Sequence, residues 1–232
     1  MKRLITLIGF ASFSACSHPT AAAPERKPAG APTVVPPEKF CVTKGALGAR
    51  IDSGMPVDVP TMRLVAPGTV GEAASVKFWF RGDSSDKRAL ASGAERRQLG
   101  LKLRAANGCN LVYVMWRLDP KPKLEVSVKS NPGMRTHEDC GANGYLKVKP
   151  DDKPPPVPAM RIGATHTLRA EIKGDALTAW IDDVVAWTGT LPDEARALEG
   201  PAGVRSDNLA FDLVELLAPA GPEGQCKHQE GD

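Results

Sequence analysis

Apolar and polar residues alternate with a period of two along much of the chain. In five runs, one set of alternate positions is apolar, and most residues between them are polar or charged. These runs lie at residues 76–80, 99–103, 124–128, 168–172 and 177–181. Period-two alternation is typical of a strand with one face in the core and one face in solvent, so it predicts antiparallel sheet.

One further run is apolar at both sets of positions. Residues 111–116 read Leu-Val-Tyr-Val-Met-Trp, with no polar residue to mark a solvent face. A strand of this kind is expected to be covered on both sides. We therefore predict that this run is a central strand of the sheet.

Turn residues separate the runs at the places where hairpins require them. Asn107-Gly108, Gly174-Asp175 and Asp182-Asp183 each fall between two strand runs, and Pro150–Pro158 is too rich in proline for a strand. Helical signals are weak and confined to residues 87–97 and 192–198. Many strands and few short helices predict an all-β fold, an antiparallel β-sandwich.

The N-terminus has the three parts of an export signal. Lys2 and Arg3 precede an apolar run, Leu4–Phe13, and small residues follow it. Phe13-Ser14-Ala15-Cys16 resembles a bacterial lipobox, which implies lipidation of Cys16 and a protein held in the cell envelope, at the outer membrane. A plain secretory signal cut after Ala15 or Ala23 is the alternative.

The boundaries of the folded domain follow from composition. Residues 1–15 are the predicted signal peptide, and residues 16–39 are a Pro/Ala-rich tether, disordered in the sense that it has no core of its own. Six of the 23 residues from 17 to 39 are proline, and such a segment cannot bury a core. The predicted sandwich covers residues 40–219, and residues 220–232 form a C-terminal tail.

Four cysteines remain after Cys16, an even number in a compartment that permits disulfides. They are Cys41, Cys109, Cys140 and Cys226. Three pairings are possible, and Cys109–Cys140 with Cys41–Cys226 is favoured, since domain ends often lie close together. No two cysteines or histidines have the close spacing of a zinc site, so no metal or other cofactor is predicted.

The last third of the sequence resembles a known fold family. Residues 166–217 contain a strand, a Lys-Gly turn, a strand ending in Asp182-Asp183, a strand with Trp187, a Gly-x-x-Gly segment at Gly200 and a closing strand. This order is similar to the second half of a concanavalin A-like jelly roll, and most similar to LamG-like and 3-keto-disaccharide hydrolase-like members. The resemblance implies a lectin-like sandwich and a carbohydrate ligand.

Candidate ligand-binding residues are few. The predicted central strand ends in Trp116 and Arg117, and Lys129 and His137 lie near a predicted disulfide. We expect these residues to share a concave face, with a solvated loop at 137–139 as the alternative. Trp180 is a second aromatic candidate, because its neighbours Ala179 and Ile181 occupy the other face of their strand.

Catalytic signatures are sparse. The chain has no Glu-x-Asp-x-x-Glu run, the pattern in which retaining glycosidases of this fold class place their carboxylates, and no nucleophile elbow, P-loop or zinc-protease motif. Asp212 and Glu215 come nearest to a carboxylate pair, but on a regular strand residues three apart point to opposite faces.

Three functions remain open on the sequence. The first is a membrane-anchored lipoprotein that binds carbohydrate or another envelope component. The second is a hydrolase that acts on glycosides or modified sugars, and the third is a structural or protein-interaction lipoprotein. The net charge of +3, with both signs interspersed, gives little attraction to nucleic acid.

Overall fold

We describe a computed structural model of the chain, which covers residues 30–90 and 92–226. Its twelve strands are β1 (Pro32–Val34), β2 (Cys41–Lys44), β3 (Met55–Val65), β4 (Ala73–Asp83), β5 (Gln98–Leu103), β6 (Leu111–Arg117), β7 (Lys123–Lys129), β8 (Tyr145–Val148), β9 (Thr165–Lys173), β10 (Ala176–Ile181), β11 (Val184–Thr190) and β12 (Gly203–Pro219). The helical segments are η1 (Pro37–Lys39), α1 (His137–Cys140) and η2 (Asp193–Ala195). The predicted signal peptide, Cys16 and most of the tether lie outside the described residues.

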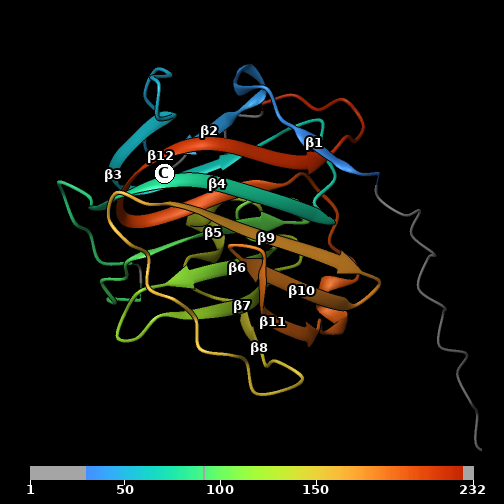
Figure 1. Cartoon of the computed structure of the whole chain (residues 1–232). Coiled ribbons are helices and arrows are strands. Elements are labelled where there is room, and N and C mark those ends of the chain that lie inside the picture. Colours follow the sequence, from blue (N-terminus) through green and yellow to red (C-terminus); the bar gives the residue numbers. More distant parts are fainter. Residues whose placement is uncertain (1–29, 91, 227–232) are drawn as a thin grey trace, which may run out of the picture.

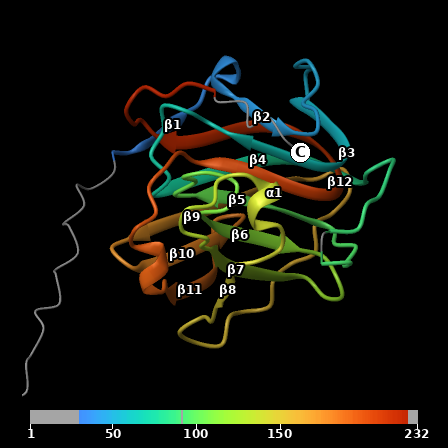
Figure 2. The same ribbon diagram turned by 180° about the vertical axis from the view of Figure 1, so that it is seen from behind.

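The strands form two antiparallel layers, as the alternation predicted. The β9–β11 layer contains β4, β9, β10 and β11, and the β5–β8 layer contains β5, β6, β7 and β8. Figure 1 shows the β9–β11 layer in front of the β5–β8 layer, and Figure 2 shows the molecule from behind. The core lies between the layers, where Phe78 of β4 meets Trp116 of β6 edge to face, with ring centroids 6.2 Å apart.

The long strand β12 belongs to both layers. Residues 203–207 pair with β5, and residues 209–217 pair with β4, while β3 pairs along both halves. Asn208 stands at the change of partner with a positive φ of 54°, a conformation that asparagine tolerates better than most residues. Its side chain accepts a hydrogen bond from the backbone N–H of Arg88 and donates to the backbone oxygens of Arg88 and Arg96.

That anchoring explains one wrong prediction. Residues 87–97, for which the sequence gave a weak helical signal, contain no helix in their described part. The segment is instead fixed to Asn208 of β12 through its backbone. The second weak signal, at 192–198, corresponds to the short turn η2.

The sheet also begins earlier than predicted. β1 lies within the predicted tether, where Thr33 pairs with Ala218 of β12, and the Val35 side chain is buried in the core. The backbone of an edge strand needs only a partner with free hydrogen-bonding groups, so a proline-rich segment can fill this position.

Both predicted disulfides are present. Cys109–Cys140 joins the start of β6 to α1, and Cys41–Cys226 joins β2 to the C-terminal segment. Within the described residues, no helix is long and apolar enough to span a bilayer.

Candidate functional site

The outer face of the β5–β8 layer is hollowed by two adjoining cavities of about 680 and 340 Å³. They share three lining residues, Arg63, Tyr113 and His137, and we refer to both together as the groove. Figure 2 shows α1, which carries His137, in front of these strands. Volumes of this size are typical of sites for small ligands.

The alternation of each strand determines which side chains line the groove. On β6, Val112, Val114 and Trp116 point into the core. Tyr113 and Met115, between them, therefore face the groove, where both form part of its lining. The sequence prediction that this strand is covered on both faces is confirmed, but the second face is covered by polar and aromatic groups of other strands as well as by apolar ones.

Strand register brings together residues that are far apart in the sequence. Arg63 on β3 lies opposite Arg205 on β12, Arg205 lies opposite Gly100 on β5, and Gly100 lies opposite Met115 on β6. Glu125 on β7 completes this row. The row crosses five strands, so charged groups of β3, β12 and β7 line the same groove.

Arg205 is buried and held by an aspartate on the same face of its own strand. Its Nε donates to Oδ2 of Asp207 at 2.9 Å, and the same oxygen accepts a hydrogen bond from Nε2 of Gln98 at 2.7 Å. Burial opposes the charge on Arg205, but the adjacent Asp207 carboxylate raises the pKa of the guanidinium above its usual value. The arginine therefore stays charged while fixed in one orientation.

Gln98 has an acceptor that no group in the described part of the chain uses. The residue is 3% exposed and lines the smaller cavity, and its Oε1 atom is buried without a hydrogen-bond partner. A buried acceptor of this kind costs free energy until a donor reaches it. The position suits a ligand hydroxyl.

Two tyrosines supply the aromatic surface of the groove. Tyr113 and Tyr145 stack with ring centroids 6.2 Å apart and an interplanar angle of 21°. Tyr113 is nearly buried, and burial raises the pKa of its hydroxyl. Tyr145, on β8, is 41% exposed and also lines the smaller cavity, so its ring is the accessible member of the pair.

Lys129 lies beneath this pair. Its Nζ is 5.2 Å from the Tyr145 ring centroid and donates hydrogen bonds to the backbone oxygens of Gly108 and Gly141. Burial, and then the charges of Arg63 and Arg205, lower the pKa of this amine to about 8. Lys129 is 1% exposed, so it supports the groove from below rather than offering a free surface cation.

The remaining predicted site residues are divided between two places. His137 lines both cavities, whereas Lys129 lines neither and donates to the backbone oxygen of Gly141, the residue after α1. Arg117 is at the end of β6, where it donates to Glu125 at 2.9 Å; it lines neither cavity of the groove.

Trp116 is a correction to the predicted site. Its side chain is fully buried between the layers, and its Nε1 donates to the backbone oxygen of Pro158 at 3.1 Å. The alternation of β6 requires this orientation, because Val112 and Val114 occupy the same face. Trp116 therefore contributes to the core and does not contact a ligand in the groove.

Trp180 is on the other side of the molecule. It projects from β10 in the β9–β11 layer, and Ala179 and Ile181 are buried on the opposite face of that strand, as predicted. The guanidinium carbon of Arg169 lies 3.7 Å from its ring centroid, which covers one face of the indole. Trp180 and the groove therefore do not form one site.

The orientation predicted for Asp212 and Glu215 is also wrong. β12 has a bulge between Leu213 and Glu215, so Asp212 pairs with Trp79 and Glu215 pairs with Lys77, which share the outer face of β4. An extra residue in a strand reverses the alternation after it, and the two carboxylates therefore face the same side. Neither lines the groove, and Asp212 is held by Ser53 and Arg81.

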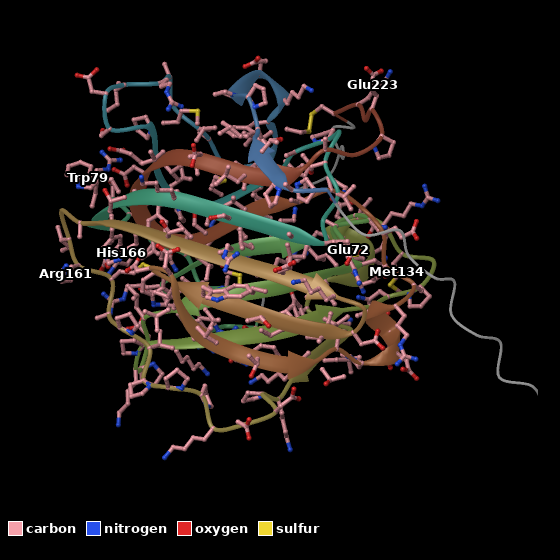
Figure 3. All side chains as sticks on the ribbon, turned by 45° about the vertical axis from the view of Figure 1, so that its right-hand side comes forward. Glu72, Trp79, Met134, Arg161, His166 and Glu223 are labelled. Carbon is pink, nitrogen blue, oxygen red and sulfur yellow. A yellow bond between two sulfur atoms is a disulfide. The ribbon has the colours of Figure 1, made fainter. Side chains whose placement is uncertain are left out.

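A histidine–aspartate pair was not predicted from the sequence: the His166 side chain is buried, whereas the Asp182 side chain is 42% exposed. His166 Nδ1 lies 2.8 Å from Asp182 Oδ2, and its Nε2 accepts a hydrogen bond from the backbone N–H of Arg161. Figure 3 shows His166 and Arg161 close together beside β9. Because a backbone N–H donates to Nε2, the Nδ1 atom is the donor to Asp182, and the pair fixes the loop before β9.

The most informative groove residues were not among the predicted site residues. They are Arg63, Gln98, Tyr145 and Arg205. A partial signal was present in the sequence: β6 is apolar on both faces, so its second face had to be covered. The partners of that face depend on strand register, which local alternation does not reveal.

The described ranges contain no group of three or more His, Cys, Asp or Glu side chains placed to hold a metal ion.

No protein-family model matches the sequence, and no curated protein matches it. Solved structures do match. The carbohydrate-binding module CBM66 from Bacillus subtilis is 12% identical over 77% of this chain and 94% of its own length, with a TM-score of 0.52.

Two further matches have lower scores. The carbohydrate recognition domain of Emp46p is 11% identical over 80% of this chain and 89% of its own, with a TM-score of 0.49. A tetrameric galectin from the sponge Cinachyrella sp. is 15% identical over 69% and 99%, with a TM-score of 0.43. At these identities the likeness concerns the fold, and the fold is a concanavalin A-like jelly-roll sandwich.

Proposed function

We propose that this protein binds carbohydrate and that the groove is its binding site. The observation that carries the proposal is the unused Oε1 acceptor of Gln98, a residue that lines the same cavity as the exposed ring of Tyr145. Sugars present hydroxyl donors and an apolar ring face, and a site for them needs both kinds of contact. The similarity in fold to a carbohydrate-binding module supports the same conclusion.

The fixed side chains suit binding without large rearrangement. Asp207 holds both Arg205 and Gln98, and Tyr113 supports Tyr145 from behind. Side chains that are already ordered lose little conformational entropy when a ligand arrives. The groove is therefore preorganised.

A glycan array that includes peptidoglycan fragments tests the proposal. Wild-type protein is expected to bind a subset of glycans saturably. Tyr145→Ala is expected to weaken that binding by tenfold or more, while Tyr145→Phe keeps the ring and retains most of it. Absence of binding to every glycan would contradict the proposal, as would equal binding by the alanine variant.

We further propose that Cys16 carries a lipid that anchors the protein in the cell envelope, at the outer membrane. The proposal rests on the lipobox-like residues 13–16 and on the tether that follows them. Several acyl chains together bind a membrane stably, since each buried methylene contributes about 0.8 kcal/mol. Metabolic labelling with a palmitate analogue is expected to mark wild-type protein and not Cys16→Ser; equal labelling of the two would contradict it.

A further inference from the structure

We infer that the groove selects an anionic saccharide, a sugar that bears a carboxylate or sulfate group. This inference rests on the proposed function and specifies the class of ligand. It follows from the charges around the smaller cavity. Among the residues that the structure describes, Glu125 is the one acidic side chain that lines this cavity. Six basic side chains line it: Lys44, Arg63, Arg88, Arg96, Lys147 and Arg205.

The acidic groups nearby offset this excess only in part. Glu125 is shared by three cations, with Arg117 and Lys123 each at 2.9 Å and Arg96 at 3.9 Å. Asp207 is fully buried behind Arg205 and is also bound by Gln98. Asp207 therefore compensates Arg205, whereas Glu125 is shared with Arg117 and Lys123 outside the cavity lining. The other basic side chains leave the cavity with a positive potential.

The positions of Arg63 and Arg205 strengthen the argument. They are directly opposite each other across β3 and β12. Like charges in this arrangement destabilise a sheet, and an anion placed beside them relieves the repulsion. Guanidinium groups bind carboxylate and sulfate oxygens in a planar, forked geometry, so this pair is well suited to such a group.

The potential of the two arginines is also felt by a neighbouring group. The charges of Arg63 and Arg205 add to burial in lowering the pKa of the Lys129 amine to about 8. A site that disfavours one more positive charge favours a negative one for the same electrostatic reason.

A bare inorganic anion does not account for the rest of the cavity. The Oε1 atom of Gln98 requires a hydrogen-bond donor, which a sulfate or carboxylate group lacks and a hydroxyl supplies. The ring of Tyr145 offers an apolar surface for a sugar ring. One ligand that satisfies the arginines, Gln98 and Tyr145 together is an acidic sugar.

The charge of the lining differs between the two cavities of the groove. The larger cavity is lined by Glu72, Glu199 and Glu223 beside Arg63 and Lys102, so its charges are nearly balanced. Figure 3 labels Glu72 and Glu223. The acidic group of the ligand is therefore expected at the β8 end, with neutral sugar residues extending into the larger cavity.

Matched oligosaccharides test the inference by titration calorimetry on the disulfide-bonded protein. Trigalacturonate is compared with its methyl ester, which removes the charge and keeps the sugar, and a sulfated trisaccharide is compared with its unsulfated form. The acid of at least one pair is expected to bind tenfold or more tightly than its neutral partner. Raising salt should weaken the binding of that acid.

Two exposed lysines on opposite layers provide a matched pair of variants. Lys147 lines the smaller cavity, whereas Lys77 is on the outer face of β4. Lys147→Gln is expected to weaken binding of the acidic form by about three- to tenfold, which is about 1 kcal/mol, with little change for the neutral form. Lys77→Gln is expected to change neither.

The possible failures are distinguishable. Equal or tighter binding of both neutral forms, or an effect of Lys77→Gln equal to that of Lys147→Gln, would overturn the anionic specificity and leave carbohydrate binding in place. Displacement of the acidic sugar by an equal concentration of inorganic sulfate would show a simple anion site and also overturn the inference. Absence of binding to either member of both pairs and to every array glycan would overturn the proposed function itself.

Discussion

Arg205 lies over the ring of Tyr113, with its guanidinium carbon 5.2 Å from the ring centroid. The two residues are on β12 and β6, which are separated by β5. Gly100 of β5 is directly opposite Arg205 in register. A glycine at this position leaves room for Met115, whose Sδ atom would lie 2.6 Å from a Cβ there, so a residue without a side chain shapes the groove.

Gly100→Ala tests this relationship. A Cβ at this position would meet the Sδ atom of Met115 at 2.6 Å and the backbone oxygen of Val114. We expect a loss of stability of about 1–3 kcal/mol, typical of overpacking, measured by urea denaturation. Gly30→Ala is the control, since a Cβ there meets nothing within 4 Å. Equal denaturation midpoints for the two variants would contradict the account.

The buried ion pair gives a second prediction. Asp207→Asn keeps the shape of the side chain and leaves the charge of Arg205 buried without compensation, so we expect a loss of about 3–5 kcal/mol in unfolding free energy. The exposed pair of Asp193 and Arg196 serves as control, and Asp193→Asn is expected to cause no measurable change. If Asp207→Asn had the same unfolding free energy as wild type, the burial of the Arg205 charge would not require Asp207.

The lowered pKa of Lys129 predicts how the free energy of unfolding depends on pH. Its pKa is about 8 in the folded protein, below the ordinary value of 10.5. Between these values the unfolded chain binds a proton that the folded protein has released, so stability rises with pH in this window. The slope is at most about 1.4 kcal/mol per pH unit.

The measurement compares wild type with Lys129→Met by chemical denaturation from pH 7.5 to 10.5, so that other titrating groups largely cancel. The stability of wild type relative to the variant is expected to rise across this range. A flat difference, or one that falls with pH, would contradict the lowered pKa.

The two disulfides make separable contributions. Cys109–Cys140 closes 31 residues and Cys41–Cys226 closes 185, so the chain-entropy estimate is about 4 and about 5 kcal/mol, respectively. Replacing Cys109 and Cys140 with serine also frees α1, which carries His137, and is expected to weaken ligand binding in both cavities.

Replacing Cys41 and Cys226 should instead affect the larger cavity, because residues 222–225 line only that one. Thermal unfolding and calorimetric titration of the two double variants measure both effects. Identical binding by both variants and wild type would show that neither disulfide positions the groove.

Local alternation was sufficient to predict the class of fold. It placed β4, β5, β7, β9 and β10 correctly, because alternate positions in these strands are apolar and buried. The strand β6 was predicted from its continuous apolar run instead. The edge strands β1, β2 and β8 lacked a clear period, since an edge strand needs fewer buried side chains. The bulge in β12 was equally invisible, and it caused the wrong orientation of Asp212 and Glu215.

The site was harder to predict than the fold. Lys129 and His137 were predicted because the predicted disulfide brings their segments together, and of the two only His137 lines the cavities. Arg63, Gln98 and Arg205 come together through strand register, which depends on which strands pair and with what offset. Trp116 was misassigned because an aromatic residue at the end of an apolar strand looks the same in sequence whether it faces the core or a ligand.

The most direct test of the central claim is to compare the two outer faces of the sandwich. Affinity for the tightest array glycan is measured by calorimetry for Tyr145→Ala, in the groove, and for Trp180→Ala, on the β9–β11 layer. We expect the affinity of Tyr145→Ala to fall by tenfold or more and the affinity of Trp180→Ala to equal that of wild type. Loss of binding in Trp180→Ala with retention in Tyr145→Ala would contradict it.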